Sequence, residues 1–323
     1  MEDFDKFIPV EDGKRSLEFL RNADLATTDY ADIKKHTDIL ARCGFTGGEL
    51  GALKHYIFRG VVIDVHEFPK ITKVERISYR PKKEGDSFQL NRASSNKYQV
   101  FYGAIPTPEF KDTKVAAVLE IDNIRNEDFP EDQYEYIALG MWFVKKPFIV
   151  ASVGMHSEIA EKNQWARSVK GNDNELYNLS KNSSFIKEVA QFIGSEFGKA
   201  VPSGQDHLYK ISAAYGDTIF DLGIGAIMFP SVQMVAKTFN VAIRSDLVDN
   251  QFIDIDAAAV IRGSKIGKEI IWGWYMQCPR VYGDELKWEE PPPPSRISQN
   301  DLERFRKIIE KEGAFAKNPE FIA

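Results

Sequence analysis

A mixed α+β fold is what the sequence predicts, and three observations support that class. Apolar residues near the N-terminus, among them Leu17, Leu20, Ile33 and Leu40, recur at the spacing of one helix face. From residue 70 onward, short runs of β-branched and aromatic residues alternate with Pro, Gly, Asn and Ser, which is typical of strands and turns. A further amphipathic stripe in 185–197 predicts another helix, so both kinds of element are expected.

Residues 1–68 are predicted to form a helical N-terminal extension. Asp29 and Asp32 stand where acidic residues stabilise the start of a helix. A glycine-rich turn then follows, and a further helix is expected to begin near Glu49.

A main domain is assigned to residues 70–285, and it is expected to begin with strands. The candidate strands are 71–79, 98–102 and 115–120, followed by a hairpin of 136–144 with 147–153. A polar, Asn-rich stretch at 157–182 predicts an exposed excursion. The remaining expected elements are helices at 185–197 and 207–222 and strands at 223–231, 241–243 and 270–276.

Residues 286–323 form the third predicted region. The proline run 291–294 predicts an extended linker. A terminal helix is expected over 298–312, with Ser298 as its N-cap.

The composition is that of an ordinary globular protein. Of 323 residues, 43% are apolar and 28% are charged, which excludes collagen-like and intrinsically disordered chains. The 42 Lys and Arg residues are outnumbered by 48 Asp and Glu residues, so the formal charge is −6. This acidic balance argues against general nucleic-acid binding, which requires a basic surface.

The cysteines and histidines predict neither a disulfide framework nor a metal centre. Cys43 and Cys278 are the only cysteines, and the five histidines include no His-x₃-His pair. The first residues are acidic where a secretory signal would be basic, and apolar runs such as 137–144 are shorter than the ~20 residues that span a bilayer. We therefore expect a soluble, cytoplasmic protein.

Two arginines and a serine alternate in the first predicted strand. On a strand, Arg76, Ser78 and Arg80 would share one face. Two guanidinium groups and a hydroxyl would suit a diphosphate, because the forked guanidinium matches phosphate oxygens. The alternative interpretation is a solvated strand face.

A second candidate pair is Arg92, in a polar turn, and Tyr102, in an aromatic strand. Either residue can be structural. In the functional interpretation Tyr102 stacks on a flat ring.

Glu120, Ser231 and Asn240 complete the candidates. Glu120 ends an apolar run, so its carboxylate is either a surface group or one that stabilises developing positive charge in a cleft. Ser231 follows a proline, where serine is common in turns, and no G-x-S-x-G motif surrounds it.

The order of these motifs resembles the RES-domain family, which is named for an arginine, a glutamate and a serine. The resemblance covers about residues 70 to 250. It consists of Arg76 in Arg-Ile-Ser, Arg92 in Asn-Arg-Ala-Ser, Tyr102 in Phe-Tyr-Gly, Glu120, Ser231 in Phe-Pro-Ser, and Asn240 in Asn-Val-Ala.

This resemblance implies a split, mixed β core with peripheral helices, similar to that of ADP-ribosyltransferase toxins. It implies cleavage of NAD⁺ by phosphorolysis or hydrolysis, as a toxin of a toxin–antitoxin pair or a related NAD⁺-depleting enzyme. The implied partner is a helix-turn-helix antitoxin, and inorganic phosphate is a possible co-substrate. No metal or other cofactor is implied.

The resemblance also assigns roles to single residues. Arg76, Glu120 and Ser231 would be catalytic, while Arg80, Arg92, Tyr102 and Asn240 would bind the substrate. Arg80 competes with Arg76 for the position of the first arginine. Two alternatives stay open: transfer of ADP-ribose to a protein, and a non-catalytic nucleotide-binding or assembly module that forms homo-oligomers.

Overall fold

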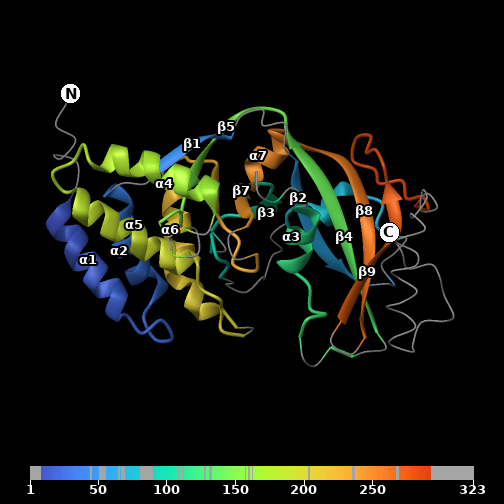
Figure 1. The fold of residues 1–323 in the computed structure, drawn as a ribbon, viewed down its shortest axis with the longest axis horizontal. Helices are drawn as coiled ribbons and strands as arrows, with labels where there is room; N and C mark the ends of the chain where they lie inside the picture. Colours follow the sequence, from blue (N-terminus) through green and yellow to red (C-terminus); the bar gives the residue numbers. More distant parts are fainter. Residues whose placement is uncertain are drawn as a thin grey trace. The chain divides into compact units, whose positions relative to one another are not determined.

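The structure is a computed structural model. It describes residues 9–43, 46–50, 56–64, 66, 70–80, 90–95, 97–107, 110, 113–126, 129–130, 133–156, 158, 161, 163–202, 204–234, 237–266 and 269–291. Within these ranges the chain forms seven α-helices and nine strands, which confirms the mixed α+β class (Figure 1). The chain divides into two compact units, each described by itself: unit 1 comprises Met1–Arg59, Ser78–Glu120 and Trp142–Asp254, and unit 2 comprises Gly60–Ile77, Ile121–Met141 and Ile255–Ala323.

Two helices begin the described chain, as predicted. They are α1 (Val10–Asn22) and α2 (Tyr30–Arg42), and their apolar stripes are buried. The helix expected near Glu49 is absent from the described residues, because Glu49 belongs to strand β1 (Thr46–Leu50). Strand β2 (Ile57–Ile63) follows. β1 pairs antiparallel with a distant strand, and such long-range pairing outweighs local propensity.

The strands of unit 1 are hydrogen-bonded in the order β1-β5-β6-β7-β3-β2. The additional strands are β3 (Val100–Ile105), β5 (Phe148–Ser152), β6 (Ala226–Pro230) and β7 (Phe239–Arg244). β5 and β6 run parallel, whereas β1–β5, β6–β7, β3–β7 and β2–β3 are antiparallel. The predicted hairpin is wrong: β5 pairs with β1 and β6, and the N–H groups of Lys145 and Lys146 both donate to Phe252 O.

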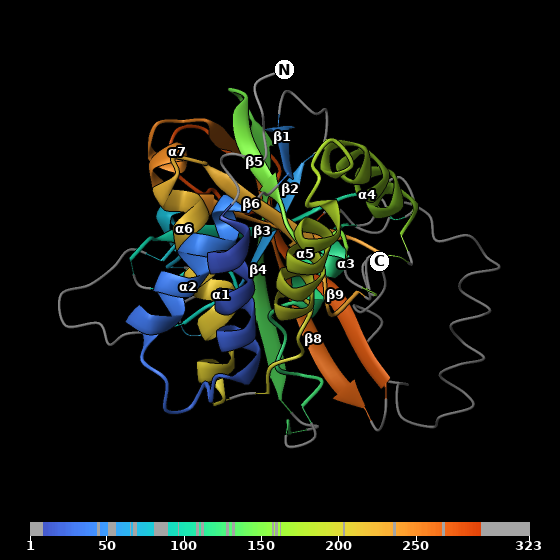
Figure 2. The ribbon, with the colours of Figure 1, turned by 90° about the vertical axis from the view of Figure 1, so that its left-hand side faces the viewer.

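Helices α1, α2, α5 and α6 lie together on one side of the unit 1 strands (Figure 2). The predicted helices are confirmed as α5 (Ser183–Phe197) and, after a short 3₁₀ turn, α6 (Lys210–Asp221); α7 (Ser245–Asp249) is short. Their apolar faces join the strands in one buried cluster, which includes Phe197, Phe220 and Phe229.

The stretch 157–182 is not simply an exposed excursion, since it contains α4 (Gln164–Tyr177). The Asn163 side chain caps this helix by accepting the Ala166 N–H at 3.0 Å. Ala166, Asp173 and Tyr177 are buried, so one face of α4 packs inward.

Two of the predicted strands are helical instead. Residues 71–79 contain a 3₁₀ helix (Val74–Ile77), and 115–120 overlaps α3 (Thr113–Leu119). In α3 the run of apolar residues is buried on one side only, because Ala116 and Ala117 face the core while Val115 is 42% exposed. A short apolar run cannot be assigned to helix or strand by periodicity alone.

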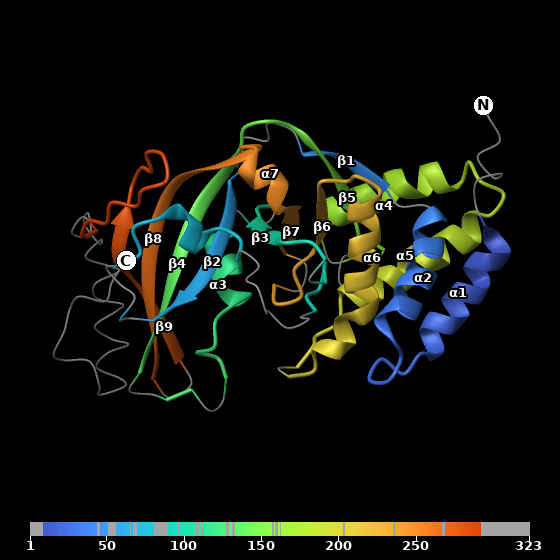
Figure 3. The ribbon, with the colours of Figure 1, turned by 180° about the vertical axis from the view of Figure 1, so that it is seen from behind.

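Unit 2 contains strands in the order β4-β8-β9, visible in Figure 3, and β8 and β9 are antiparallel. They are β4 (Tyr134–Val144), β8 (Ile253–Ile266) and β9 (Glu269–Cys278). The Arg262 guanidinium lies 5.0 Å from the Tyr134 ring and 5.5 Å from the Tyr275 ring. The split-core likeness to ADP-ribosyltransferases stays a prediction.

The predicted helix that starts at Ser298 lies outside the described residues. Among the helices that are described, none has the length and apolar character that crossing a membrane requires.

Candidate functional site

Glu120 and Ser231 meet in unit 1 although 111 positions separate them along the chain. The Ser231 hydroxyl donates a hydrogen bond to Glu120 Oε1 at 2.5 Å. Ser231 is fully buried and Glu120 is half-buried. The fold therefore joins two residues that the sequence singled out separately, and it holds a carboxylate with a charge-assisted hydrogen bond.

Local structure fixes both partners of this pair. Glu120 directly follows α3, and its N–H donates to Ala116 O at 3.1 Å, which closes the last helical turn. Ser231 directly follows β6, and its N–H donates to Thr238 O at 3.0 Å. The Ser231 hydroxyl also accepts the Met234 N–H at 3.1 Å. Accepting from the backbone and donating to Glu120 gives this hydroxyl a defined orientation.

Asn240 and Tyr102 share one face of the neighbouring strands. Asn240 of β7 pairs with Phe229 of β6 and with Ala104 of β3. Tyr102 lies two residues before Ala104 on β3, so its side chain is on the same face as Asn240. The structure thus places two predicted substrate-binding residues on one face, Asn240 on the strand next to β6 and Tyr102 on the strand after that.

Two buried polar groups near Ser231 have no hydrogen-bond partner within the described part of the chain. Asn240 is 8% exposed, and its amide makes no hydrogen bond there. Thr238 is fully buried, and its Oγ1 also lacks a partner. Leaving a buried donor or acceptor unpaired costs about 1–3 kcal/mol, and this cost applies to the fully enclosed Thr238 Oγ1. The Asn240 amide is not among the enclosed atoms without a partner, so its hydrogen-bonding capacity can be reached by a bound group. Thr238 was not predicted as a site residue, because no motif in the sequence distinguishes it.

The Tyr102 hydroxyl is engaged by the turn at 91–95. It accepts the Ala93 N–H at 3.2 Å. Burial raises the pKa of Tyr102 to about 12, although the hydrogen bonds from Ser94 and Ala93 act in the opposite direction. The phenol is therefore neutral at physiological pH and helps to hold the turn. Stacking on nicotinamide stays a prediction.

Arg92 caps the carboxyl end of α5. Its Nη1 donates to the carbonyls of Phe197 and Lys199, both at 2.7 Å. The guanidinium also lies 5.2 Å from the Tyr209 ring. These contacts agree with the structural interpretation of this arginine. A contact with diphosphate stays a prediction.

A buried carboxylate, Asp217, anchors the same turn to α6. Ser95 donates its hydroxyl to Asp217 Oδ2 at 2.5 Å and its N–H to Oδ1 at 3.2 Å. Tyr30 of α2 donates to Oδ2 at 2.7 Å. Burial raises the pKa of Asp217, whereas the hydrogen bonds from Ser95 and Tyr30 lower it. A Cβ on Gly216 would lie 2.0 Å from Ala93 O, so the backbones of α6 and the turn are in direct contact.

Arg59 of β2 is a cationic residue that the sequence analysis missed. Its Nε donates to Ser78 O at 2.7 Å and its Nη1 to Tyr102 O at 2.9 Å. The guanidinium lies 5.3 Å from the Phe101 ring, and burial lowers its pKa to about 10. No carboxylate among the described residues pairs with it. The sequence feature that could have identified Arg59 is its position as a charged residue inside the apolar run 57–63.

Arg59 and Asn240 lie on opposite faces of the unit 1 strands. Phe58 pairs with Ala104, so Phe58 is on the Asn240 face and Arg59 is on the other face. The candidate residues of unit 1 therefore flank β3 on both sides.

The predicted alternation of Arg76, Ser78 and Arg80 on one strand face is wrong. Arg76 lies in the 3₁₀ helix of unit 2, and Ser78 is buried while both arginines are exposed. Together with His66, Lys70 and other residues of unit 2, Arg76 lines a pocket of about 460 Å³. Arg80 belongs to unit 1.

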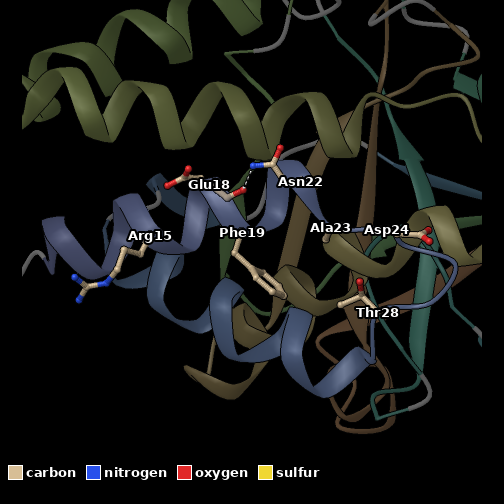
Figure 4. A pocket seen from close by; sticks show the side chains of 7 residues that line it. All are labelled: Arg15, Glu18, Phe19, Asn22, Ala23, Asp24 and Thr28. Atoms are coloured by element: carbon tan, nitrogen blue, oxygen red, sulfur yellow. Dashed lines mark hydrogen bonds between the residues drawn. The ribbon is translucent and has the colours of Figure 1, made fainter.

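A separate pocket of about 490 Å³ lies along α1 and the loop to α2 (Figure 4). It is lined by Arg15, Glu18, Phe19, Asn22, Ala23, Asp24 and Thr28. The Asp24 carboxylate is engaged there by the Ala26 N–H at 3.0 Å and the Thr27 hydroxyl at 2.9 Å. None of the predicted site residues lines it.

The described residues contain no group of three or more His, Cys, Asp or Glu side chains arranged to hold a metal ion. No protein-family model, curated protein or solved structure matches this chain. The Glu120–Ser231 pair and the unpaired groups near it are therefore the features on which a functional proposal rests.

Proposed function

We propose that unit 1 cleaves the bond between nicotinamide and ribose in NAD⁺, by hydrolysis or by phosphorolysis. The observation that carries this proposal is the half-buried Glu120 carboxylate held by the buried Ser231 hydroxyl at 2.5 Å. The order of motifs along the chain, which resembles RES domains, supplies the substrate class.

The residue types suit this chemistry. The nicotinamide ring of NAD⁺ is already cationic, so it leaves C1′ as a neutral base and needs no strong general acid. Positive charge then develops on the ribose, in a transition state like that of glycosidases. We assign Glu120 to the stabilisation of this charge and Ser231 to the orientation of Glu120.

The phosphates of NAD⁺ require cationic partners. Arg59 has no carboxylate partner among the described residues, but it lies on the face of the unit 1 strands opposite Asn240, so we do not assign it to the same substrate. Guanidinium groups bind phosphate oxygens through two parallel hydrogen bonds. Arg92 is our candidate, although its Nη1 already donates to two carbonyls.

The Asn240 amide suits a ribose hydroxyl or the carboxamide of nicotinamide. It is 8% exposed and has no hydrogen-bond partner among the described residues. An amide can donate and accept at once, as both of these ligand groups require.

We further propose that the reaction depletes NAD⁺ as a toxin, or as part of a related stress or defence response, in the cytoplasm. The partner would be a helix-turn-helix antitoxin. This biological role is supported by the resemblance alone.

Incubation of the purified full chain with NAD⁺ tests the proposal, with nicotinamide and ribosyl products followed by chromatography. Release that needs phosphate would define a phosphorylase, and release without phosphate would define a glycohydrolase. Glu120→Gln keeps the side-chain size and removes the charge, so we expect kcat to fall about 10²- to 10³-fold.

The matched control is Glu188→Gln, whose carboxylate pairs with Arg21 at an exposed site on α5. We expect this variant to retain full activity. Equal rates for Glu120→Gln and wild type would refute the assignment of Glu120. ADP-ribose bound covalently to an added protein would instead identify a transferase, and no cleavage under any of these conditions would refute NAD⁺ chemistry.

A further inference from the structure

His156 and Asp173 form a buried pair that the proposed mechanism has not used. His156 follows β5 closely, and Asp173 lies on α4. His156 Nε2 and Asp173 Oδ2 are 3.2 Å apart, and each side chain is 5% exposed. An ionised carboxylate can only accept hydrogen bonds, so Asp173 places the imidazole proton on Nε2.

The other ring nitrogen of His156 is available. Nδ1 makes no hydrogen bond to any residue that the structure describes. In the part of the chain that the structure describes, the fully enclosed polar atoms without a partner are Asp122 Oδ2, Trp142 Nε1 and Thr238 Oγ1. Nδ1 is not one of them, so it is not fully enclosed. A neutral imidazole with Nε2–H fixed by a carboxylate presents a lone pair on Nδ1, as a general base requires.

The strand topology brings His156 and Ser231 to the carboxyl ends of two neighbouring strands. β5 and β6 are parallel neighbours, so the chain leaves both strands at one edge. The Val153 N–H donates to Met228 O at 2.8 Å, and a Cβ on Gly154 would lie 3.0 Å from Pro230 Cδ. Gly154 therefore lies beside the residue that precedes Ser231, and His156 is two residues farther along.

We propose that His156 is the general base of the reaction, with Asp173 as its positioning residue; this rests on the proposed NAD⁺ cleavage. An oxygen of water, or of phosphate that still carries a proton, bonds to ribose C1′. The C1′–N bond breaks, and its electron pair leaves with neutral nicotinamide. The proton of the attacking oxygen passes to His156 Nδ1.

Titratable side chains surround His156. From α4, Asp173 faces the ring and Tyr177 lies 5.6 Å from it between centroids. Burial and the charge of Asp173 raise the pKa of Tyr177, so the phenol is neutral throughout. Glu161 is the nearby acid, and its pKa is lowered mainly by Lys170 and to a smaller extent by His156. A general base acts only in its unprotonated form, so the proposal predicts that activity falls toward acid pH.

The test compares nicotinamide release by wild type, His156→Gln and Asp173→Asn across pH 5 to 8, with His36→Gln as control. His36 is a half-buried histidine of unit 1, and its Nδ1 lies 3.0 Å from Ser16 Oγ. We expect kcat of His156→Gln to fall about 10²- to 10⁴-fold with KM nearly unchanged and the acid limb abolished. His36→Gln should match wild type.

Chemical rescue separates a base from a purely structural residue. Imidazole added to His156→Ala should restore part of the rate, with a pH dependence that follows the added base. If His156→Ala does not fold, the pH profile of His156→Gln decides. Wild-type release with an unchanged rate and acid limb in His156→Gln overturns the assignment of His156 alone. No release by wild type overturns the proposed function, and the assignment of His156 with it.

Discussion

The turn at 91–95 and the strand ends at 231–240 are both polar regions of unit 1, yet they differ in hydrogen bonding. At the turn, Ser95 gives both its N–H and its hydroxyl to Asp217. Tyr102 accepts a further backbone N–H. Each of these polar groups has a hydrogen-bond partner, and the partners come from distant elements of the fold. This region is therefore organised for stability.

The strand ends have the opposite character. Thr238 Oγ1 is fully enclosed and lacks a partner among the described residues. The amide of Asn240, a residue that is 8% exposed, also has no partner there. Such groups reduce the free energy of unfolding unless something binds them. Under the proposed function, a substrate would reach the Asn240 amide beside the Glu120–Ser231 pair, whereas Thr238 Oγ1 is fully enclosed. Substitutions should therefore affect stability at the turn and activity at the strand ends.

Asp217→Ala should produce the largest loss of stability. It removes the acceptor of three hydrogen bonds, so the two donors of buried Ser95 and the hydroxyl of half-buried Tyr30 lose their partner. We expect the free energy of unfolding to fall by about 3 kcal/mol in urea denaturation. Asp249→Ala is the control, because Asp249 accepts from Tyr79 at an exposed site, where the loss should stay below about 1 kcal/mol. Equal losses would show that the turn is not anchored as described.

Asp221→Asn tests the flank of the same turn through pH. Burial alone would raise the pKa of Asp221, but hydrogen bonds from Lys97, Tyr98 and Lys34 outweigh it and lower the pKa to about 2. Because the pKa is lower in the folded protein, the carboxylate stabilises the fold above about pH 4, the unfolded value. That contribution disappears as pH falls from about 4 to 2.

The Asp221→Asn variant should thus be less stable than wild type by about 1 kcal/mol at pH 6, since the site is partly solvated. The deficit should shrink below pH 4 in matched urea titrations. A deficit that persists unchanged to pH 2 would show that the interaction does not depend on the carboxylate charge.

The sequence was informative where structure is local or where motifs follow one another in order. Helical stripes predicted α1, α2 and α5, and the motif order singled out Glu120 and Ser231, which the fold brings to 2.5 Å. Pairing between distant segments was not visible. β1 carries two glycines and no apolar alternation, and it is a strand because β5 lies beside it.

Several site residues depend on such distant contacts. Arg59 is distinctive because it lacks a counter-ion, Asp217 because it receives Ser95 and Tyr30, and His156 because α4 supplies Asp173. Each of these properties depends on whether a residue distant in the sequence contacts the side chain. The residue type at one position therefore does not reveal it. Arg76 was misplaced for the related reason that a 3₁₀ turn and a strand share the same short apolar pattern.

Thr238→Val should have the smallest effect on stability. Threonine and valine have nearly the same shape, but the exchange normally costs stability because a buried hydroxyl loses its hydrogen bonds. Thr238 Oγ1 has no such bond among the described residues, so the free energy of unfolding should change by less than about 0.5 kcal/mol, or rise. The substitution removes no carbon atom, so the packing of the side chain against its neighbours is kept. Urea denaturation of the variant beside Asp217→Ala measures the contrast directly. A loss above about 1 kcal/mol would reveal that Thr238 is satisfied within the folded chain, and the difference between the two polar regions would then disappear.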